Sequence, residues 1–251
     1  MISLKSKFWQ IDNIKTVLFD KDGTFIDLHY FWGKMTELRV QEIIKRFELD
    51  VDCFENLCLC LGYDVNSEKM LSDGITALYS RSKIIEIFKG NLFDFGVKTT
   101  NDELAEIFDY VSEIFYQDMV KYTKPIESAI KFIKILHQEG VKLGVVTSDS
   151  VVSTQLTLEN FGWTDLFGVV VGRESSSETK ESGALTKIAL AELNADLKTT
   201  IMIGDAPMDY ISAKNAGIDR TILVSTGQIS IEELKQTSEF VLNDLSELEI
   251  V

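Results

Sequence analysis

The amino-acid sequence predicts an α/β fold in which a Rossmann-like parallel sheet carries helices on both faces and a second, all-helical region is inserted into it. Two observations support this prediction. The candidate strands are short apolar runs without alternation, which is typical of parallel strands buried on both faces. Strands and helices then alternate regularly from Val141 onwards, which favours a parallel sheet built from strand–helix–strand units.

The first strand is predicted over residues 16–19, and it leads into a long region with helical spacing. Apolar residues recur at helical intervals within 35–47 and again within 104–115. Asn101, followed by two acidic residues, provides a start signal for the later helix. Because no strand pattern interrupts residues 28–121, we expect this region to be inserted after the first strand.

The remainder of the chain returns to alternating elements. Each helix there is amphipathic or rich in small apolar residues, and each strand is a short apolar run that ends in polar residues. The predicted strands lie within 141–150, 167–172, 199–209 and 220–226, and the predicted helices within 127–140, 154–162, 183–194 and 210–217.

The composition excludes several classes of protein. With 45% hydrophobic residues the chain has enough apolar surface for a real core, and its formal net charge of -15 argues against a nucleic acid or an anionic membrane as the main partner. No apolar run approaches the ~18 residues of a membrane span, and the opening residues lack a secretory signal. The three cysteines lack CxxC spacing, which favours reduced thiols. We expect a cytoplasmic protein.

Polar side chains follow three of the predicted strands. In a sheet of parallel strands the carboxyl ends meet at one edge, where ligands bind, so these side chains are expected to converge. Carboxylates, a hydroxyl and one lysine suit a hard, oxygen-preferring metal together with a phosphate. The residues concerned are Asp20 and Asp22, Thr147 and Ser148, and Asp205 and Asp209, with Lys180 as the nearest candidate cation.

At these positions the sequence resembles the haloacid dehalogenase superfamily, specifically its phosphatases of the phosphoglycolate phosphatase type. The first motif of that family, DxDGT, matches the residues from Asp20 to Thr24, and the fourth, GDxxxD, matches those from Gly204 to Asp209. The second motif, an apolar strand that ends in Thr or Ser, is matched at Thr147. Together these motifs are specific, although each alone is weak.

The resemblance implies a two-step reaction and a metal cofactor. Asp20 would attack phosphorus and form an aspartyl-phosphate, while Asp22 would protonate the leaving oxygen and later deprotonate water. Mg²⁺ would be held by Asp20, by the backbone carbonyl of Asp22 and by Asp205.

The resemblance also assigns the residues that hold the phosphoryl group. Thr147, the amide of Ser148 and Lys180 would bind its oxygens. Family members commonly follow this lysine with proline, whereas here Glu181 follows it. The supporting residues would be Gly23, Thr24 and Asp209, with Asp209 acting through the water shell of the metal or by orienting Lys180.

These implications give the full expectation. Residues 1–27 and 122–251 would form the core of haloacid dehalogenase type, and 28–121 a helical cap. The chain would hydrolyse a small phosphate monoester as a monomer or a homodimer. Two alternatives stay open: a sugar phosphomutase of the same superfamily, and a module that binds a phosphate ester without turnover.

Overall fold

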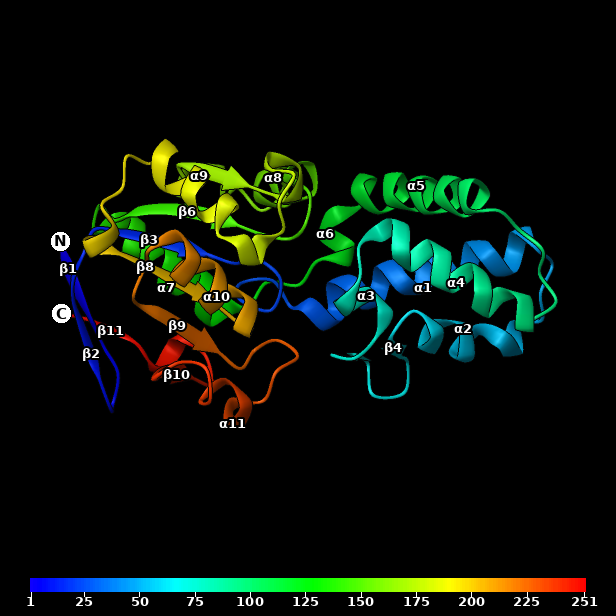
Figure 1. Cartoon of the computed structure of the whole chain (residues 1–251), viewed down its shortest axis with the longest axis horizontal. Coiled ribbons are helices and arrows are strands. Elements are labelled where there is room, and N and C mark those ends of the chain that lie inside the picture. Colours follow the sequence, from blue (N-terminus) through cyan, green and yellow to red (C-terminus); the bar gives the residue numbers. More distant parts are fainter. The chain divides into compact units, whose positions relative to one another are not determined.

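The computed structural model describes all residues from 1 to 251 and divides them into two compact units (Figure 1). The first unit consists of Met1–Asp27 and Pro125–Val251, and the second of Leu28–Lys124. The assignment of residues 28–121 as a cap and of the remaining residues as its core stays a prediction. The structure contains no helix with the length and apolar character needed to span a membrane.

The first unit is built on a six-stranded sheet in which every strand pair is parallel. Its strand order is β10-β9-β8-β3-β6-β7, so the first strand of the sheet along the chain, β3, lies between β8 and β6. The chain first builds outwards through β6 and β7 and then returns to the other side of β3. Such a reversal of strand order is where open α/β sheets bind ligands. The strands are β3 (Thr16–Phe19), β6 (Lys142–Val146), β7 (Val169–Val171), β8 (Thr200–Gly204), β9 (Thr221–Val224) and β10 (Phe240–Leu242).

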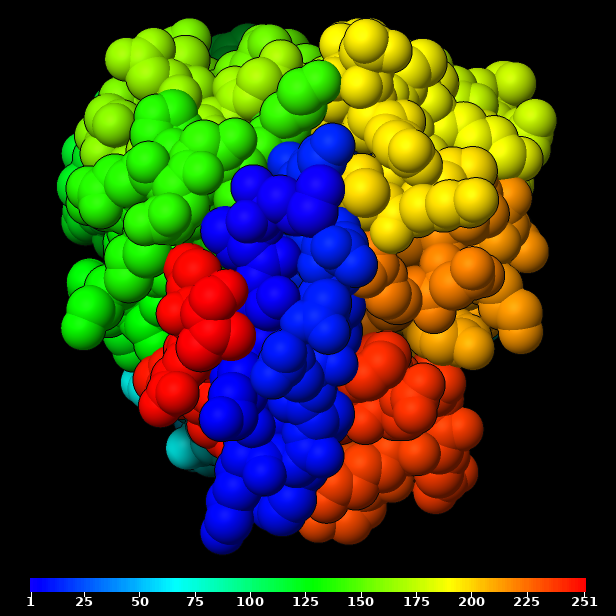
Figure 2. Space-filling view, turned by 90° about the vertical axis from the view of Figure 1, so that its left-hand side faces the viewer, coloured from blue at the N-terminus to red at the C-terminus, as the bar shows by residue number.

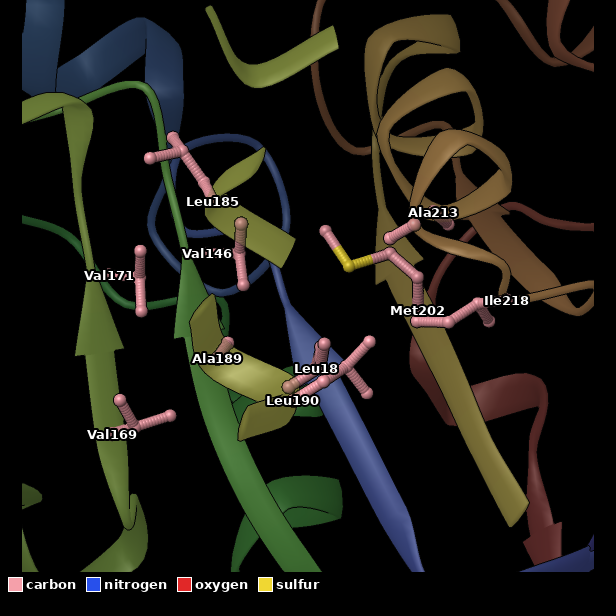
Figure 3. Packing of buried hydrophobic residues seen from close by; sticks show 11 residues of the cluster. Leu18, Val146, Val169, Val171, Leu185, Ala189, Leu190, Met202, Ala213 and Ile218 are labelled. Atoms are coloured by element: carbon pink, nitrogen blue, oxygen red, sulfur yellow. The ribbon is translucent and has the colours of Figure 1, made fainter. Parts of the chain in front are cut away.

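Helices cover both faces of this sheet, as the sequence predicted. On one face, α9 and α10 pack on a buried cluster that includes Leu18, Val146 and Met202 from three adjacent strands (Figure 3). Ala189 and Ala213 bring small side chains from the two helices, which lets their backbones approach the sheet. The helices of this unit are α7 (Glu127–Gln138), α8 (Val151–Asn160), α9 (Ala184–Glu192), α10 (Pro207–Ala216) and the short α11 (Ile231–Leu234).

A small antiparallel sheet joins the two ends of the chain. Its order is β11-β1-β2, with β1 at Ile2–Lys5, β2 at Gln10–Ile14 and β11 at Glu249–Ile250. Figure 2 shows the N-terminal residues in blue beside the C-terminal residues in red. These strands were not predicted from the sequence, because each is short and the pairing of β1 with β11 joins residues almost a whole chain length apart.

The second unit is mainly helical, but it also contains two short strands. β4 (Tyr63–Asp64) and β5 (Lys69–Met70) form an antiparallel hairpin, so the expectation that no strand interrupts this region was wrong. Two-residue strands are too short to show a period of two, and the connecting turn is fixed by Asp64 Oδ1, which accepts from Asn66 N at 3.0 Å. The helices are α1 (Leu28–Arg46), α2 (Phe54–Cys60), α3 (Ile75–Leu78), α4 (Arg81–Asp94), α5 (Asn101–Gln117) and α6 (Met119–Tyr122).

Candidate active site

Two aspartates follow adjacent strands at the carboxyl edge of the parallel sheet. Asp20 comes directly after β3, and its backbone N–H still donates to Ile203 O of β8 at 2.9 Å. Asp205 comes directly after β8. Because β3 and β8 are paired in parallel with Phe19 opposite Ile203, both carboxylates reach the same edge of the sheet, and both are buried.

Lys180 reaches this edge from a separate loop. It begins a single turn of 3-10 helix, Lys180–Ser182, that ends at Gly183 in a left-handed conformation with φ of 81°. Its Nζ donates to Asp20 Oδ1 at 2.5 Å and lies 2.6 Å from Asp209 Oδ1. The turn therefore places the ammonium between two carboxylates although no proline follows the lysine.

Asp209 contacts Lys180 and also caps the start of its own helix. It lies in the first turn of α10, where Oδ2 accepts from the backbone N–H groups of Asp205 and Ala206, each at 3.1 Å. A carboxylate at a helix N-terminus pairs with N–H groups that have no intrahelical partner. With Oδ2 held there, Oδ1 faces Lys180. One side chain therefore both caps its helix and contacts Lys180.

The carboxylate of Asp205 lies between two glycines. A Cβ built on Gly23 or on Gly227 would overlap the Asp205 carboxyl group. Gly227 belongs to the loop after β9, and the neighbouring Thr226 hydroxyl donates to Gly23 O at 2.5 Å. Since a side chain at either glycine would displace the carboxylate, these two loops determine where Asp205 lies.

The loop after Asp20 is a compact turn. The Lys21 carbonyl accepts from the N–H groups of Phe25 and Ile26 at 3.0 and 3.1 Å, and Gly23 adopts a φ of 88°, which glycine reaches without strain. Thr24 is buried, and its hydroxyl has no hydrogen-bond partner within the protein.

A second ion-pair cluster lies beside the first motif. Lys21 is fully buried, with Nζ 2.7 Å from Asp22 Oδ1 and 3.0 Å from Asp149 Oδ2. Burial alone would lower the pKa of Lys21, but the charges of Asp22 and Asp149 outweigh burial and raise it above its usual range. Lys21 is therefore a buried cation at neutral pH.

Thr147 and Ser148 follow β6, the other neighbour of β3. Thr147 is buried, and its Oγ1 accepts from Asp149 N at 3.0 Å. Ser148 is exposed, and its Oγ contacts Met208 Sδ at 3.5 Å. Both lie at the carboxyl edge of the sheet that carries Asp20, while their observed side-chain contacts are with their own loop and with the start of α10.

The electrostatics of the aspartate cluster favour an added cation. Burial and the charge of Asp209 together raise the pKa of Asp20 to about 7 against the attraction of Lys180. Burial also raises the pKa of Asp205 well above its usual value, and Asp20 and Asp209 add to that shift. Burial alone would lower the pKa of Lys180, but the same two carboxylates raise it. One ammonium thus contacts two of the three buried carboxylates of this cluster.

The donor set fits a divalent metal ion. Carboxylate oxygens of Asp20, Asp205 and Asp209 lie within 4.8 Å of one another. Such oxygens are the ligands that Mg²⁺ prefers, and a divalent cation would offset the excess negative charge. The residues present are therefore compatible with the metal that the sequence resemblance implied.

Sequence reasoning did not identify several residues of this region. Lys21 could have been identified from the sequence, because a charged residue between two aspartates at the end of a buried apolar strand needs a charged partner. Asp149 and Gly227 also follow predicted strands and could have been included with the other strand-end residues. Their contacts with Lys21 and Asp205 join distant parts of the chain, which a single sequence does not reveal.

The chain is similar to several known proteins. A pyrophosphatase PpaX from Halalkalibacterium halodurans is 25% identical over 84% of this chain and 83% of that protein. A phosphoglycolate phosphatase from Aquifex aeolicus is 24% identical over 94% of this chain and 95% of its own length. A solved structure of a predicted phosphoglycolate phosphatase from Haemophilus somnus has the same fold, with a TM-score of 0.70, 18% identity and coverage of 94% of this chain and 97% of the other.

The family model for haloacid dehalogenase-like hydrolases matches residues 14–217, which include every strand-end aspartate described above. The resemblance stated from the sequence motifs is confirmed by this match, and so is the prediction of a hydrolase. The chain belongs to the family of haloacid dehalogenase-like hydrolases.

Proposed function

We propose that this chain is a Mg²⁺-dependent phosphatase that hydrolyses a small phosphate ester through an aspartyl-phosphate on Asp20. The observation that carries the proposal is the position of Lys180 Nζ, 2.5 Å from Asp20 Oδ1 and within the same cluster as Asp205 and Asp209. An anionic nucleophile approaches an anionic ester only where cations offset the repulsion. At an effective dielectric constant of about 20, each close opposite charge contributes roughly 4 kcal/mol before desolvation.

The proposed reaction has two steps on the same carboxylate. An oxygen of Asp20 attacks phosphorus, the bond from phosphorus to the leaving oxygen breaks, and Asp22 donates a proton to that oxygen. Water then attacks the phosphorus of the aspartyl-phosphate, Asp22 takes the proton from this water, and inorganic phosphate leaves. Asp20 and Asp22 return to their starting states.

The remaining residues hold the phosphoryl group and the metal. When bound, Mg²⁺ supplies positive charge that offsets the negative charge of the phosphoryl oxygens. Asp20, Asp205 and the backbone carbonyl of Asp22 would hold it. Lys180, oriented by Asp209, would bind phosphoryl oxygens together with the Thr147 hydroxyl and the Ser148 amide, and Gly23 and Thr24 would shape the loop.

For the substrate, we propose a small and strongly anionic phosphate compound. The curated relatives are named for pyrophosphate and for phosphoglycolate, which both have these properties. The second unit, Leu28–Lys124, is proposed to be the cap domain that selects the leaving group. Action as a monomer or homodimer and a cytoplasmic location stay predictions.

Phosphate release from a panel of small phosphate esters and from the anhydride pyrophosphate, with and without Mg²⁺, tests the proposal. The panel should contain pyrophosphate, phosphoglycolate, sugar phosphates and nucleoside monophosphates. We expect Mg²⁺-dependent release by the wild type and loss of at least ~10³-fold in Asp20→Asn. Asp196→Asn, which removes a carboxylate that caps the turn before β8, serves as a matched control and should retain activity.

Three results would contradict the proposal. Near-normal phosphate release by Asp20→Asn would show that Asp20 is not the nucleophile. Folded wild type that binds esters but releases no phosphate would favour the binding module, and conversion of a sugar monophosphate into its isomer would favour the phosphomutase.

A further inference from the structure

The buried lysine inside the first motif has no role in the reaction described above. Lys21 is fully buried, and its Nζ contacts Asp22 Oδ1 at 2.7 Å and Asp149 Oδ2 at 3.0 Å. Side chains of Asp20 and Asp22 would point to the same side of an extended chain, and the residue between them to the other. An apolar residue could fill that buried position.

Stability alone is a poor explanation for this lysine. Moving an ammonium out of water is costly, and a buried ion pair is often no more stabilising than well-packed apolar residues of similar volume. Buried ion pairs do impose defined geometry through short, charge-assisted hydrogen bonds. The structural effect of Lys21 is therefore to determine where its two carboxylate partners lie.

Asp149 is itself held by the surrounding backbone. Its N–H donates to Thr147 Oγ1 at 3.0 Å, its Oδ1 accepts from Ser150 N at 2.7 Å, and its carbonyl accepts from Arg173 N at 3.0 Å. With Asp149 anchored in the loop after β6, Lys21 connects this loop to the loop after β3.

Asp22 is the more exposed partner of Lys21. Its side chain retains 12% of its accessible surface, against 5% for Asp149 and none for Lys21. The Asp22 oxygen closer to the buried lysine is Oδ1. The contact thus distinguishes the two oxygens of a carboxylate whose proposed task is to carry a proton.

We propose that Lys21, fixed by Asp149, is a positioning residue that holds Asp22 Oδ1 so that Oδ2 exchanges the proton with the leaving oxygen and with water. This inference rests on the proposed function, because it assigns the atoms of its proton transfers. In the first step the Oδ2 proton passes to the leaving oxygen as its bond to phosphorus breaks. In the second step Oδ2 takes a proton from the attacking water.

A double variant separates positioning from simple charge balance. Lys21→Met alone would leave Asp149 as an unpaired buried charge, which could prevent folding. Lys21→Met with Asp149→Asn removes both charges and keeps an acceptor for Ser150 N. If Lys21 served only to neutralise Asp149, this double variant would behave like the wild type. Lys142→Met is the control, because Lys142 Nζ donates to Leu193 O at 2.7 Å, away from the ion-pair cluster.

The readout is kcat/KM for 4-nitrophenyl phosphate and for phenyl phosphate, both with saturating Mg²⁺. 4-Nitrophenolate leaves without a proton, whereas the more basic phenolate needs one in the transition state. We expect the double variant to fold, to keep much of its activity on 4-nitrophenyl phosphate and to lose at least ~10-fold more on phenyl phosphate. A purely structural role would lower both values by the same factor.

The outcomes distinguish this inference from the proposed function. A wild type that releases phosphate neither from the two aryl esters nor from any compound of the panel above overturns the proposed function, and the inference with it. An active wild type with a double variant of unchanged ester preference overturns the inference alone. If the double variant does not fold, Asp149→Asn alone replaces it: a shift in preference against phenyl phosphate supports the inference, and unchanged preference contradicts it.

Discussion

The ammonium of Lys180 donates to Oδ1 of Asp20 at 2.5 Å, although 160 residues separate the two in the sequence. This contact joins the end of the central strand to the loop before α9. The ammonium of Lys180 also supplies positive charge to the buried aspartate cluster, because it contacts Asp209 as well. The chemistry proposed for Asp20 therefore depends on Lys180.

Replacing Lys180 by methionine is expected to abolish most activity. The variant removes the donor to Asp20 and leaves three buried carboxylates without a protein cation, so we expect kcat to fall at least ~10²-fold. Without Mg²⁺ the protein should also lose roughly 3–5 kcal/mol of stability. Steady-state kinetics and thermal melts with and without Mg²⁺ measure both effects. Lys187→Met, an exposed lysine on α9, should change neither, and retention of full activity by Lys180→Met would refute this role.

Replacing Gly227 by alanine is expected to weaken metal binding while preserving the fold. The new Cβ would overlap the Asp205 carboxyl group and displace it. Residues that orient a metal ligand typically contribute a factor of ~10–100 to metal affinity. The Mg²⁺ dependence of phosphate release should shift by about that factor. Gly90→Ala provides the control, since nothing lies within 4 Å of a Cβ at that position, and an equal shift in both variants would argue against displacement of Asp205.

Stabilisation by Mg²⁺ is expected to increase with pH. Burial raises the pKa of Asp20 to about 7 and the pKa of Asp205 well above its usual value. Groups with raised pKa values stabilise the fold fully below their unfolded pKa and lose this contribution as pH rises through the folded pKa. The metal-free protein should therefore lose stability between about pH 5 and about pH 8, where these carboxylates ionise.

Ionisation of these carboxylates favours Mg²⁺ binding at the upper end of this pH range, because Mg²⁺ binds the ionised form. The pKa of Asp149 is lowered, mainly by Lys21 against the opposing effect of burial, so its contribution is lost only in more acidic solution. Thermal melts with and without Mg²⁺ at both ends of the range test the prediction. An equal gain in Tm at the two pH values would contradict it.

Loss of a core side chain is expected to affect stability without affecting the chemistry. Leu190 of α9 packs in the cluster of Figure 3 with Leu18 and Ala189. Leu190→Ala should cost about 2–5 kcal/mol, because a buried cavity remains. Denaturant unfolding measures this cost, and kcat should stay unchanged below the melting temperature. The exposed Glu192→Ala on the same helix should alter neither quantity, and a large loss of kcat in Leu190→Ala would show that the cluster also positions the site.

Local signals in the sequence were sufficient to predict five of the six strands of the parallel sheet and the aspartates at their ends, but the edge strand β10 was not predicted. Asp20 and Asp205 each follow an apolar run, and the fold brings such ends together because neighbouring strands are parallel. For Asp209 the sequence left two ways of supporting the site open. The structure shows the side chain in contact with Lys180, which corresponds to the second of them.

The contacts that determine side-chain positions could not be predicted in this way. The pairing of Lys21 with Asp149 and the overlap that Gly227 would create with Asp205 depend on distances between loops that are far apart in the sequence. The same holds for β1 and β11, which pair across almost the full length of the chain. The short hairpin of β4 and β5 could not be predicted for another reason, because strands of two residues show no periodic pattern.

The most direct test of the account is to trap the phosphoryl group on Asp20. In Asp22→Asn the second step loses its base, so the aspartyl-phosphate should accumulate when Mg²⁺ and 4-nitrophenyl phosphate are added and the reaction is quenched with acid. Mass spectrometry of peptides should then find one phosphoryl group on the peptide that contains Asp20, and hydroxylamine should remove it. Release of 4-nitrophenol without any phosphoryl group on Asp20 would contradict the account, because it would show attack by water or by another residue.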